Sequence, residues 1–294
     1  MNALIIGATG YVGSAIDEAM TARGHRTVGT ARSEIARAKL QARGTAVVPG
    51  DAAKPQTLIA AVKAADAVVY CVQATDADSM AVDLDAVRTI ARAMAGSERT
   101  FVYLSSTWSY GDTTGIADEN AEVRPPAYVS KRADLDRMTL NMVKIGIRGH
   151  VVRSGIVYGD GGGVPAMFVH SARARSASTI VGEGRNHWAA IGREDLGRLV
   201  SLVIERGKPG QAYNAVDDYA YTVREIAEAA SRGAGAQGRT TVVDPDILGP
   251  FGDCLVLDQR VSALRAKREL GWNPSPTSIV DELERGSYLA AQIA

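Results

Sequence analysis

Residues 3–13 decide the fold and read Ala-Leu-Ile-Ile-Gly-Ala-Thr-Gly-Tyr-Val-Gly. Four apolar residues run directly into a glycine turn, and the turn leads into an amphipathic segment at 12–23. Glycine permits a tight turn and lets a pyrophosphate approach the backbone, while the free N–H groups of a helix N-terminus face its negative charge. A strand, a glycine turn and a helix in this order predict a dinucleotide-binding βαβ unit.

The rest of the first half repeats this alternation of short apolar runs and helix-length amphipathic segments. Runs rich in Val and Ile, apolar throughout, are typical of parallel strands buried on both faces. The pattern predicts an α/β fold, a doubly wound parallel (Rossmann) sheet with a smaller C-terminal cap. We expect a dinucleotide-binding domain over 1–153. Residues 154–294 should form mostly a substrate-binding cap, with some segments returning to the Rossmann layer.

Composition excludes several classes of protein. The 294 residues carry 33 Lys and Arg against 33 Asp and Glu, so the formal net charge is zero. This gives no electrostatic case for nucleic acid or an anionic membrane. No apolar run approaches the roughly 20 residues that a bilayer span needs. Cys71 and Cys254 make no disulfide framework, and neither they nor the histidines show metal-ligand spacing, so we expect a cytoplasmic protein without a metal.

Several stretches beyond the glycine turn carry a resemblance. The turn has the spacing G-x-x-G-x-x-G, and the other stretches are 49–51 (PGD), 105–111 (SSTWSYG), 153–159 (RSGIVYG), 194–196 (EDL) and 270–274 (LGWNP). Together they resemble the extended or atypical short-chain dehydrogenase/reductase superfamily, in its NAD(P)-dependent epimerase/dehydratase-like branch. The resemblance covers nearly the whole chain but does not specify a substrate.

The resemblance implies a nicotinamide cofactor, and the end of the second strand indicates which one. An NAD site usually has an acidic residue there, whereas an arginine accommodates the 2′-phosphate of NADP. Arg32 and Ser33 follow the strand, with no acidic residue before Glu34, which favours NADP over NAD. The other cofactor contacts that the resemblance implies are Gly7, Thr9, Gly10, Tyr11, Val12, Gly13, Asp51, Ala52, Val72, Gln73, Ser105, Lys131, Ser154 and Ile156.

The resemblance also implies a catalytic serine, tyrosine and lysine, here Ser106, Tyr128 and Lys131. The family spacing Y-x-x-x-K is one residue shorter in this chain, and Arg132 fills the fourth place. Lys131 can still serve if the first helical turn is tightened, and Arg132 is the alternative cation. If the Ser-Lys pair is aligned instead, Ala127 falls where the tyrosine belongs.

Substrate pockets in such sheets lie beyond the carboxyl ends of the strands. His187 and Trp188 could frame a polar ring or pack the cap against the sheet. Three arginines, Arg173, Arg175 and Arg185, could meet a diphosphate, although scattered arginines are usually solvated. The substrate-lining residues that we expect are Thr107, Tyr110, Tyr158, His187 and Trp188.

These residues lead to one expected function and two alternatives. We expect an NADP-dependent oxidoreductase that transfers a hydride between nicotinamide and a carbonyl or alcohol of a small polar substrate. The alternatives are a sugar-type epimerase or dehydratase, and a non-catalytic NADP-binding regulator. Apolar stripes on helices 77–95 and 129–145 could pair across a homodimer axis or pack on their own sheet.

Overall fold

The computed structural model describes residues 1–72 and 77–290 and divides into two compact units, each made of three chain segments. The first unit comprises Met1–Ser105, Lys131–Arg153 and Gly197–Tyr213. The second comprises Ser106–Ser130, Ser154–Leu196 and Asn214–Ala294. The chain passes from the first unit to the second between Arg153 and Ser154, the position at which the sequence analysis puts the domain boundary. Residues 106–130 belong to the second unit, and residues 197–213 return to the first.

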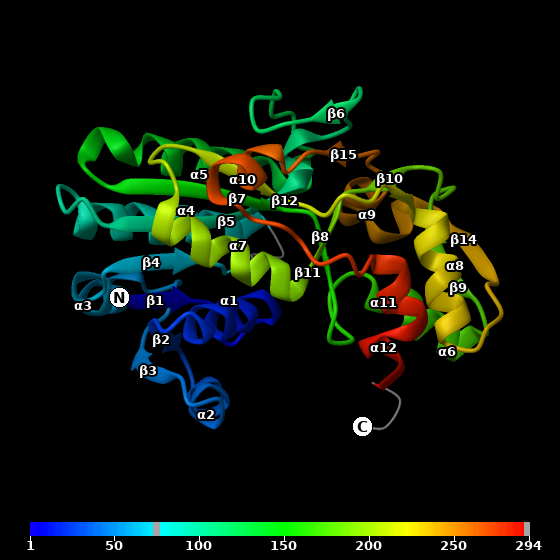
Figure 1. Ribbon diagram of the computed structural model, residues 1–294, viewed down its shortest axis with the longest axis horizontal. Coiled ribbons are helices and arrows are strands. Elements are labelled where there is room, and N and C mark those ends of the chain that lie inside the picture. The colour runs from blue at the N-terminus through cyan, green and yellow to red at the C-terminus, as the bar shows by residue number, and fades with distance from the viewer. Residues whose placement is uncertain (73–76, 291–294) are drawn as a thin grey trace. The chain divides into compact units, whose positions relative to one another are not determined.

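A seven-stranded sheet forms the centre of the first unit, in the order β12-β7-β5-β4-β1-β2-β3 (Figure 1). The pairs β1–β2, β1–β4, β2–β3 and β4–β5 are all parallel, so the predicted doubly wound sheet is confirmed. After β1 the chain adds β2 and β3 on one side of that strand, and it then adds β4 on the other side. Such a reversal of strand order is the topological switch point at which sheets of this kind bind ligands. The strands are β1 Asn2–Ile6, β2 Arg26–Ala31, β3 Ala46–Pro49, β4 Ala67–Tyr70, β5 Thr100–Ser106, β7 Arg148–Ser154 and β12 Ala212–Ala215.

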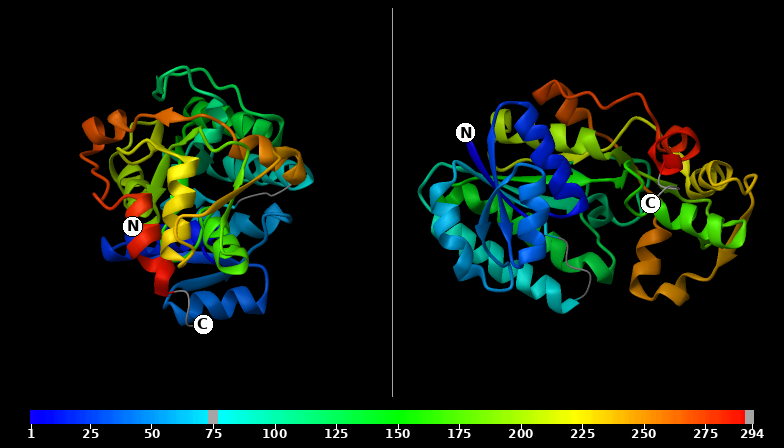
Figure 2. Two further views of the ribbon diagram at one scale, coloured as in Figure 1. Left: turned by 90° about the vertical axis from the view of Figure 1, so that its right-hand side faces the viewer. Right: turned by 90° about the horizontal axis from the view of Figure 1, so that it is seen from below.

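Helices cover both faces of this sheet (Figure 2). Helices α1 and α7 pack closely at Gly197, where a Cβ atom would lie only 2.4 Å from the carbonyl oxygen of Ala15. The other face shares a core with α3, α4 and α5, in which Val87, Met94 and Leu135 are buried within their own unit. The helices are α1 Tyr11–Ala22, α2 Glu34–Ala42, α3 Ile59–Ala64, α4 Ala77–Met94, α5 Ser130–Leu140 and α7 Arg193–Arg206.

Two helical segments are divided in the structure, and the second of them contains the helix predicted over 129–145. Residues 55–64 form a 3₁₀ turn, Pro55–Leu58, before α3. Residues 127–145 form the 3₁₀ turn η3 (Ala127–Val129), then α5, then a second 3₁₀ segment, Asn141–Ile145. The side-chain amide of Asn141 donates to the carbonyl oxygen of Arg137 at 2.8 Å and so competes with the helical backbone bonds.

Short elements make up the second unit. Two-stranded sheets pair β8 (Ile156–Tyr158) with β11 (Ala190–Gly192), β9 (Ser178–Val181) with β14 (Thr240–Val243), β10 (His187–Trp188) with β13 (Tyr221–Thr222), and β6 (Ile116–Ala117) with β15 (Arg260–Val261). The helices are α6 Ala166–Arg175, α8 Val223–Gly233, α9 Pro250–Leu255, α10 Leu264–Leu270, α11 Ile279–Arg285 and α12 Ser287–Ala290.

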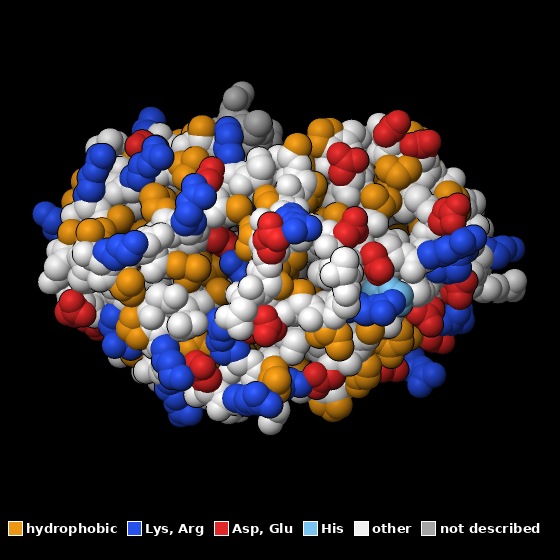
Figure 3. Space-filling view, turned by 90° about the horizontal axis from the view of Figure 1, so that it is seen from above, with side chains coloured by type: hydrophobic (Ala, Val, Ile, Leu, Met, Phe, Trp, Pro, Cys, Tyr) orange, Lys and Arg blue, Asp and Glu red, His pale blue; other side chains and the backbone are white. Residues whose placement is uncertain are grey.

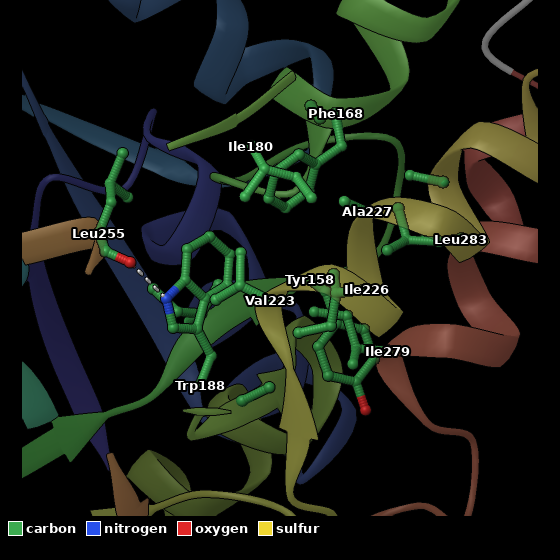
Figure 4. Packing of buried hydrophobic residues seen from close by; sticks show 14 of the residues in the cluster. Tyr158, Phe168, Ile180, Trp188, Val223, Ile226, Ala227, Leu255, Ile279 and Leu283 are labelled. Atoms are coloured by element: carbon green, nitrogen blue, oxygen red, sulfur yellow. Dashed lines mark hydrogen bonds between the residues drawn. The ribbon is translucent and has the colours of Figure 1, made fainter. Parts of the chain in front are cut away.

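Aromatic rings anchor the core of the second unit (Figure 4). Phe168 of α6 stacks on Trp188 with 5.7 Å between ring centroids. The indole N–H of Trp188 donates to the carbonyl oxygen of Leu255 at 3.0 Å, so the buried polar atom is satisfied. A capping box at Thr222 and Glu225 starts α8 and fixes its entry into this core.

Acidic and basic side chains are interspersed over the face shown in Figure 3. Within the described part of the chain, none of the helices combines the length and apolar character that crossing a bilayer requires. Across the same residues, we find no group of three or more His, Cys, Asp or Glu side chains placed to hold a metal ion.

Candidate cofactor and active site

The glycine turn between β1 and α1 has the tight geometry that its sequence predicts. Gly7 has φ +104°, and the N–H of Gly10 donates to its carbonyl oxygen at 3.0 Å. A Cβ on Gly13 would lie 2.1 Å from the same oxygen, so only glycine fits there. Gly10 caps α1 without a side-chain hydrogen bond, and the N–H groups at the N-terminus of a helix favour an anion. This cradle fits a pyrophosphate, and Thr9, Tyr11 and Val12 border it.

Two arginines of the first unit concern the cofactor site, one directly after β2 and one directly after α2. Arg32 is exposed directly after the strand, and the Ser33 hydroxyl caps α2 by accepting from the N–H of Ala36 at 3.2 Å. Arg43, which the sequence analysis missed, donates to the carbonyl oxygen of Ala8 in the glycine turn at 3.2 Å. Arg43 and Ala8 are 35 residues apart in the sequence, so no local sequence pattern connects them.

The loops after β3 and β4 hold the next expected contacts. Asp51 accepts from the N–H of Ala53 at 3.0 Å and starts a turn in which Ala52 is half-buried. Val72 is half-buried after β4, whereas Gln73 lies outside the described residues. Burial raises the pKa of Cys71 to about 12, and its thiol donates to the carbonyl oxygen of Ile6 at 3.2 Å, so Cys71 is an unreactive packing residue.

A buried charge cluster lies where β5, β7 and α5 meet in the first unit. Arg153 donates through Nε to Oδ2 of Asp136 at 2.8 Å, with side chains only 5% and 3% exposed. Burial raises the pKa of Asp136, although Arg153, the Ser105 hydroxyl and Arg132 all oppose the rise. Burial also raises the pKa of Tyr103, which a hydrogen bond from Arg132 opposes. Ser105 and Arg132 therefore face this cluster.

The predicted tyrosine lies in a tightened turn, and the predicted lysine lies in the helix that follows. Tyr128 is half-buried in η3 and belongs to the second unit, whereas Lys131 is half-buried in α5 and belongs to the first. In a 3₁₀ turn, side chains three residues apart eclipse one another. The 3₁₀ turn contains Tyr128 and ends at Val129, α5 begins at Ser130, and Arg132, one residue after Lys131, is buried.

Two hydroxyls of the motif after β5, those of Ser106 and Ser109, are buried without a hydrogen-bond partner in the described residues, and only Ser106 belongs to a residue that is partly exposed. Thr107 donates to Oε1 of Gln259 at 3.1 Å, and Tyr110 donates to Oδ1 of Asn214 at 2.8 Å. The Oγ of Ser106 is buried and has no hydrogen-bond partner among residues 1–72 and 77–290. A buried polar group without a partner is costly, so this hydroxyl is suited to a substrate oxygen.

The remaining expected residues are used mostly for packing. Ser154 and Ile156 are each 8% exposed, and the Tyr158 hydroxyl contacts Asp217 and the carbonyl oxygen of Thr277. His187 and Trp188 are consecutive in β10, and consecutive strand residues point to opposite faces. His187 pairs with Asp258 at 2.8 Å while Trp188 enters the core. The two rings therefore do not frame one ligand.

Comparison with known proteins places the chain in a family. Residues 3–215 match the family described as the NAD dependent epimerase/dehydratase family. The uncharacterized protein YLL056C of Saccharomyces cerevisiae is 29% identical over 98% of this chain and 99% of its own length. A dTDP-glucose 4,6-dehydratase from Bacillus anthracis, solved with NAD, has a TM-score of 0.83 at 18% identity, covering 100% of this chain and 97% of that one. A human epimerase family protein solved with NADPH has a TM-score of 0.78 at 18% identity, covering 98% and 99%. The chain therefore belongs to the NAD dependent epimerase/dehydratase family.

Proposed function

We propose that the protein is an NADP-dependent oxidoreductase acting on a carbonyl or alcohol substrate. The observation that carries the proposal is the buried, uncommitted hydroxyl of Ser106 at the end of β5. The bound nicotinamide would supply or accept the hydride. The glycine cradle would hold its pyrophosphate, and Arg32 with Ser33 would hold the 2′-phosphate of NADP.

The chain's own residues would manage the proton. The Ser106 hydroxyl would hydrogen-bond the substrate oxygen, and the Tyr128 phenol would donate or accept the proton there. A free phenol has a pKa of about 10, and a nearby ammonium favours its ionised form. We assign that role to Lys131, because Arg132 already serves Tyr103 and Asp136.

The experiment follows NADPH oxidation with a panel of aldehydes and ketones, comparing the wild type with Ser106→Ala. We expect turnover to fall about a hundredfold or more, the usual contribution of a positioned acid–base group and its substrate contact. Ser109→Ala is the matched control, since the Ser109 hydroxyl is also buried without a partner in the described residues of the same motif. Equal losses in the two variants, or no hydride transfer with any carbonyl, would refute the proposal.

A further inference from the structure

Phe251 contacts the aromatic rings of Trp108 and Tyr128 in the second unit. Its ring meets Trp108 edge to face, with centroids 6.0 Å apart and planes at 70°. It meets Tyr128 in the same way at 5.8 Å and 62°. Helix α9, which carries Phe251, packs directly against the turn η3 that carries Tyr128. An aromatic wall therefore borders the phenol to which we assign proton transfer.

The fold fixes the position of this wall. At Gly252 a Cβ atom would lie 2.2 Å from the carbonyl oxygen of Pro245, so the helix approaches the preceding turn as closely as glycine allows. At its other end, the Leu255 carbonyl oxygen accepts the indole N–H of Trp188, as Figure 4 shows. Helix α9 is thus anchored on both sides of Phe251, and this limits the movement of the phenylalanine ring.

Of the three arginines considered for a diphosphate, two have partners and one is solvated. Arg173 donates to the carbonyl oxygen of Tyr288 at 2.7 Å. Arg185 is 85% exposed and pairs with Glu183 at 3.1 Å. Arg175 is exposed at the end of α6. A nucleoside diphosphate needs charge-assisted bonds to cations, and these three side chains are committed or solvated.

We infer that Phe251 determines specificity, and that the substrate bears an apolar ring or alkyl group beside its reacting carbon. The inference rests on the function proposed above and replaces the small polar substrate expected from the sequence. An aromatic group gains edge-to-face contacts against Phe251 and Trp108. A polar group facing Phe251 would lose its water without gaining a partner from that ring.

Binding of benzyl alcohol to the full chain, measured by saturation-transfer NMR, tests the inference without catalysis. We expect Phe251→Ala to weaken binding at least tenfold and Phe251→Tyr, which keeps the ring, to preserve it. Ile247→Ala is the matched control, because Ile247 is 69% exposed on the turn that precedes α9. UDP-glucose should not displace benzyl alcohol. Urea midpoints of the variants verify that each one folds.

A parallel assay of NADPH oxidation with benzaldehyde separates the two proposals. If benzaldehyde is reduced but Phe251→Ala binds benzyl alcohol as well as the wild type, Phe251 does not determine specificity, while the oxidoreductase proposal stands. If binding depends on Phe251 but neither benzaldehyde nor any other carbonyl is reduced, the apolar site stands and the oxidoreductase proposal fails. Displacement of benzyl alcohol by UDP-glucose would overturn the apolar assignment.

Discussion

The Tyr158 hydroxyl lies 3.1 Å from Oδ2 of Asp217 and 2.8 Å from the carbonyl oxygen of Thr277. A phenol donates only one proton, so both hydrogen bonds form together only when the Asp217 carboxyl is itself protonated. Burial raises the pKa of Asp217 to about 7. The nearby Asp218 adds to the rise, whereas the N–H of Tyr219, the Tyr158 hydroxyl and Lys267 oppose it. A proton is therefore part of this packing arrangement near neutral pH.

The first prediction concerns stability against pH. The folded state holds the Asp217 proton more tightly than the unfolded chain, whose carboxyl has a pKa near about 3.9. The protonated carboxyl therefore adds to the free energy of unfolding. This stabilisation is fully present below the unfolded pKa and is lost as the pH rises to about 7. The loss amounts to about 4 kcal/mol at most. Asp217→Asn should remove it, so the variant should gain stability relative to the wild type at pH 8 compared with pH 4, measured by urea unfolding. Parallel pH dependences would contradict the assignment.

The second prediction concerns cofactor choice. Arg32→Ala should weaken NADP binding at least tenfold and leave NAD binding nearly unchanged, because only the 2′-phosphate needs the guanidinium. Fluorescence titration with both cofactors measures the effect. Arg37→Ala is the control, since Arg37 pairs with Glu34 on the same helix at 3.4 Å. Unchanged NADP affinity in Arg32→Ala would move the 2′-phosphate away from this residue.

The third prediction concerns the glycine cradle. Gly13→Ala places a Cβ atom 2.1 Å from the Gly7 carbonyl oxygen, so the turn must open and both cofactors should bind poorly. Gly10→Ala meets that oxygen only at 3.2 Å and should be milder in both cofactor affinity and melting temperature. Isothermal titration and thermal unfolding give the two readouts. If Gly13→Ala binds cofactor normally, the cradle has been misplaced.

The fourth prediction separates the roles of three residues near the start of α5. Tyr128→Phe should lower turnover about a hundredfold with cofactor affinity intact, since only the proton-transferring hydroxyl is lost. Lys131→Ala should lower both turnover and cofactor affinity. Arg132→Ala should chiefly destabilise the fold, because it removes the hydrogen bond to buried Tyr103 and one of the positive charges beside buried Asp136. Loss of cofactor affinity in Arg132→Ala alone would transfer the cationic role to Arg132.

The fifth prediction uses the buried pair of Arg153 and Asp136. Asp136→Asn leaves the Arg153 charge buried without its carboxylate and should cost about 3–5 kcal/mol of unfolding free energy. Asp134→Asn is the control on the same helix, because its pair with Arg137 is 50% and 75% exposed. Exposed pairs contribute little, so its stability should be nearly unchanged. Chemical denaturation of both variants tests the contrast.

The sequence predicts best what is encoded locally. The turn from Gly7 to Gly13 follows from glycine spacing within one βα unit, and the order of strands and helices follows from hydrophobic period. Positions fixed by tertiary contact gave no such signal. Arg43 reaches Ala8, and Phe251 reaches Trp108 and Tyr128, across long stretches of chain. His187 and Trp188 are neighbours in the sequence, which suggests one shared site. Their side chains point to opposite faces only because both residues lie in a strand, and the sequence does not show that strand clearly.

The division of each unit into three chain segments has a consequence for how this protein can diversify. A unit encoded by one continuous stretch can be exchanged as a whole by recombination, but neither unit here has a single pair of ends. A new specificity must therefore arise by substitution or insertion within segments that already exist. The short segment around α9, which carries Phe251 and lies within one stretch of the second unit, is the kind of place where such a change leaves the cofactor cradle untouched.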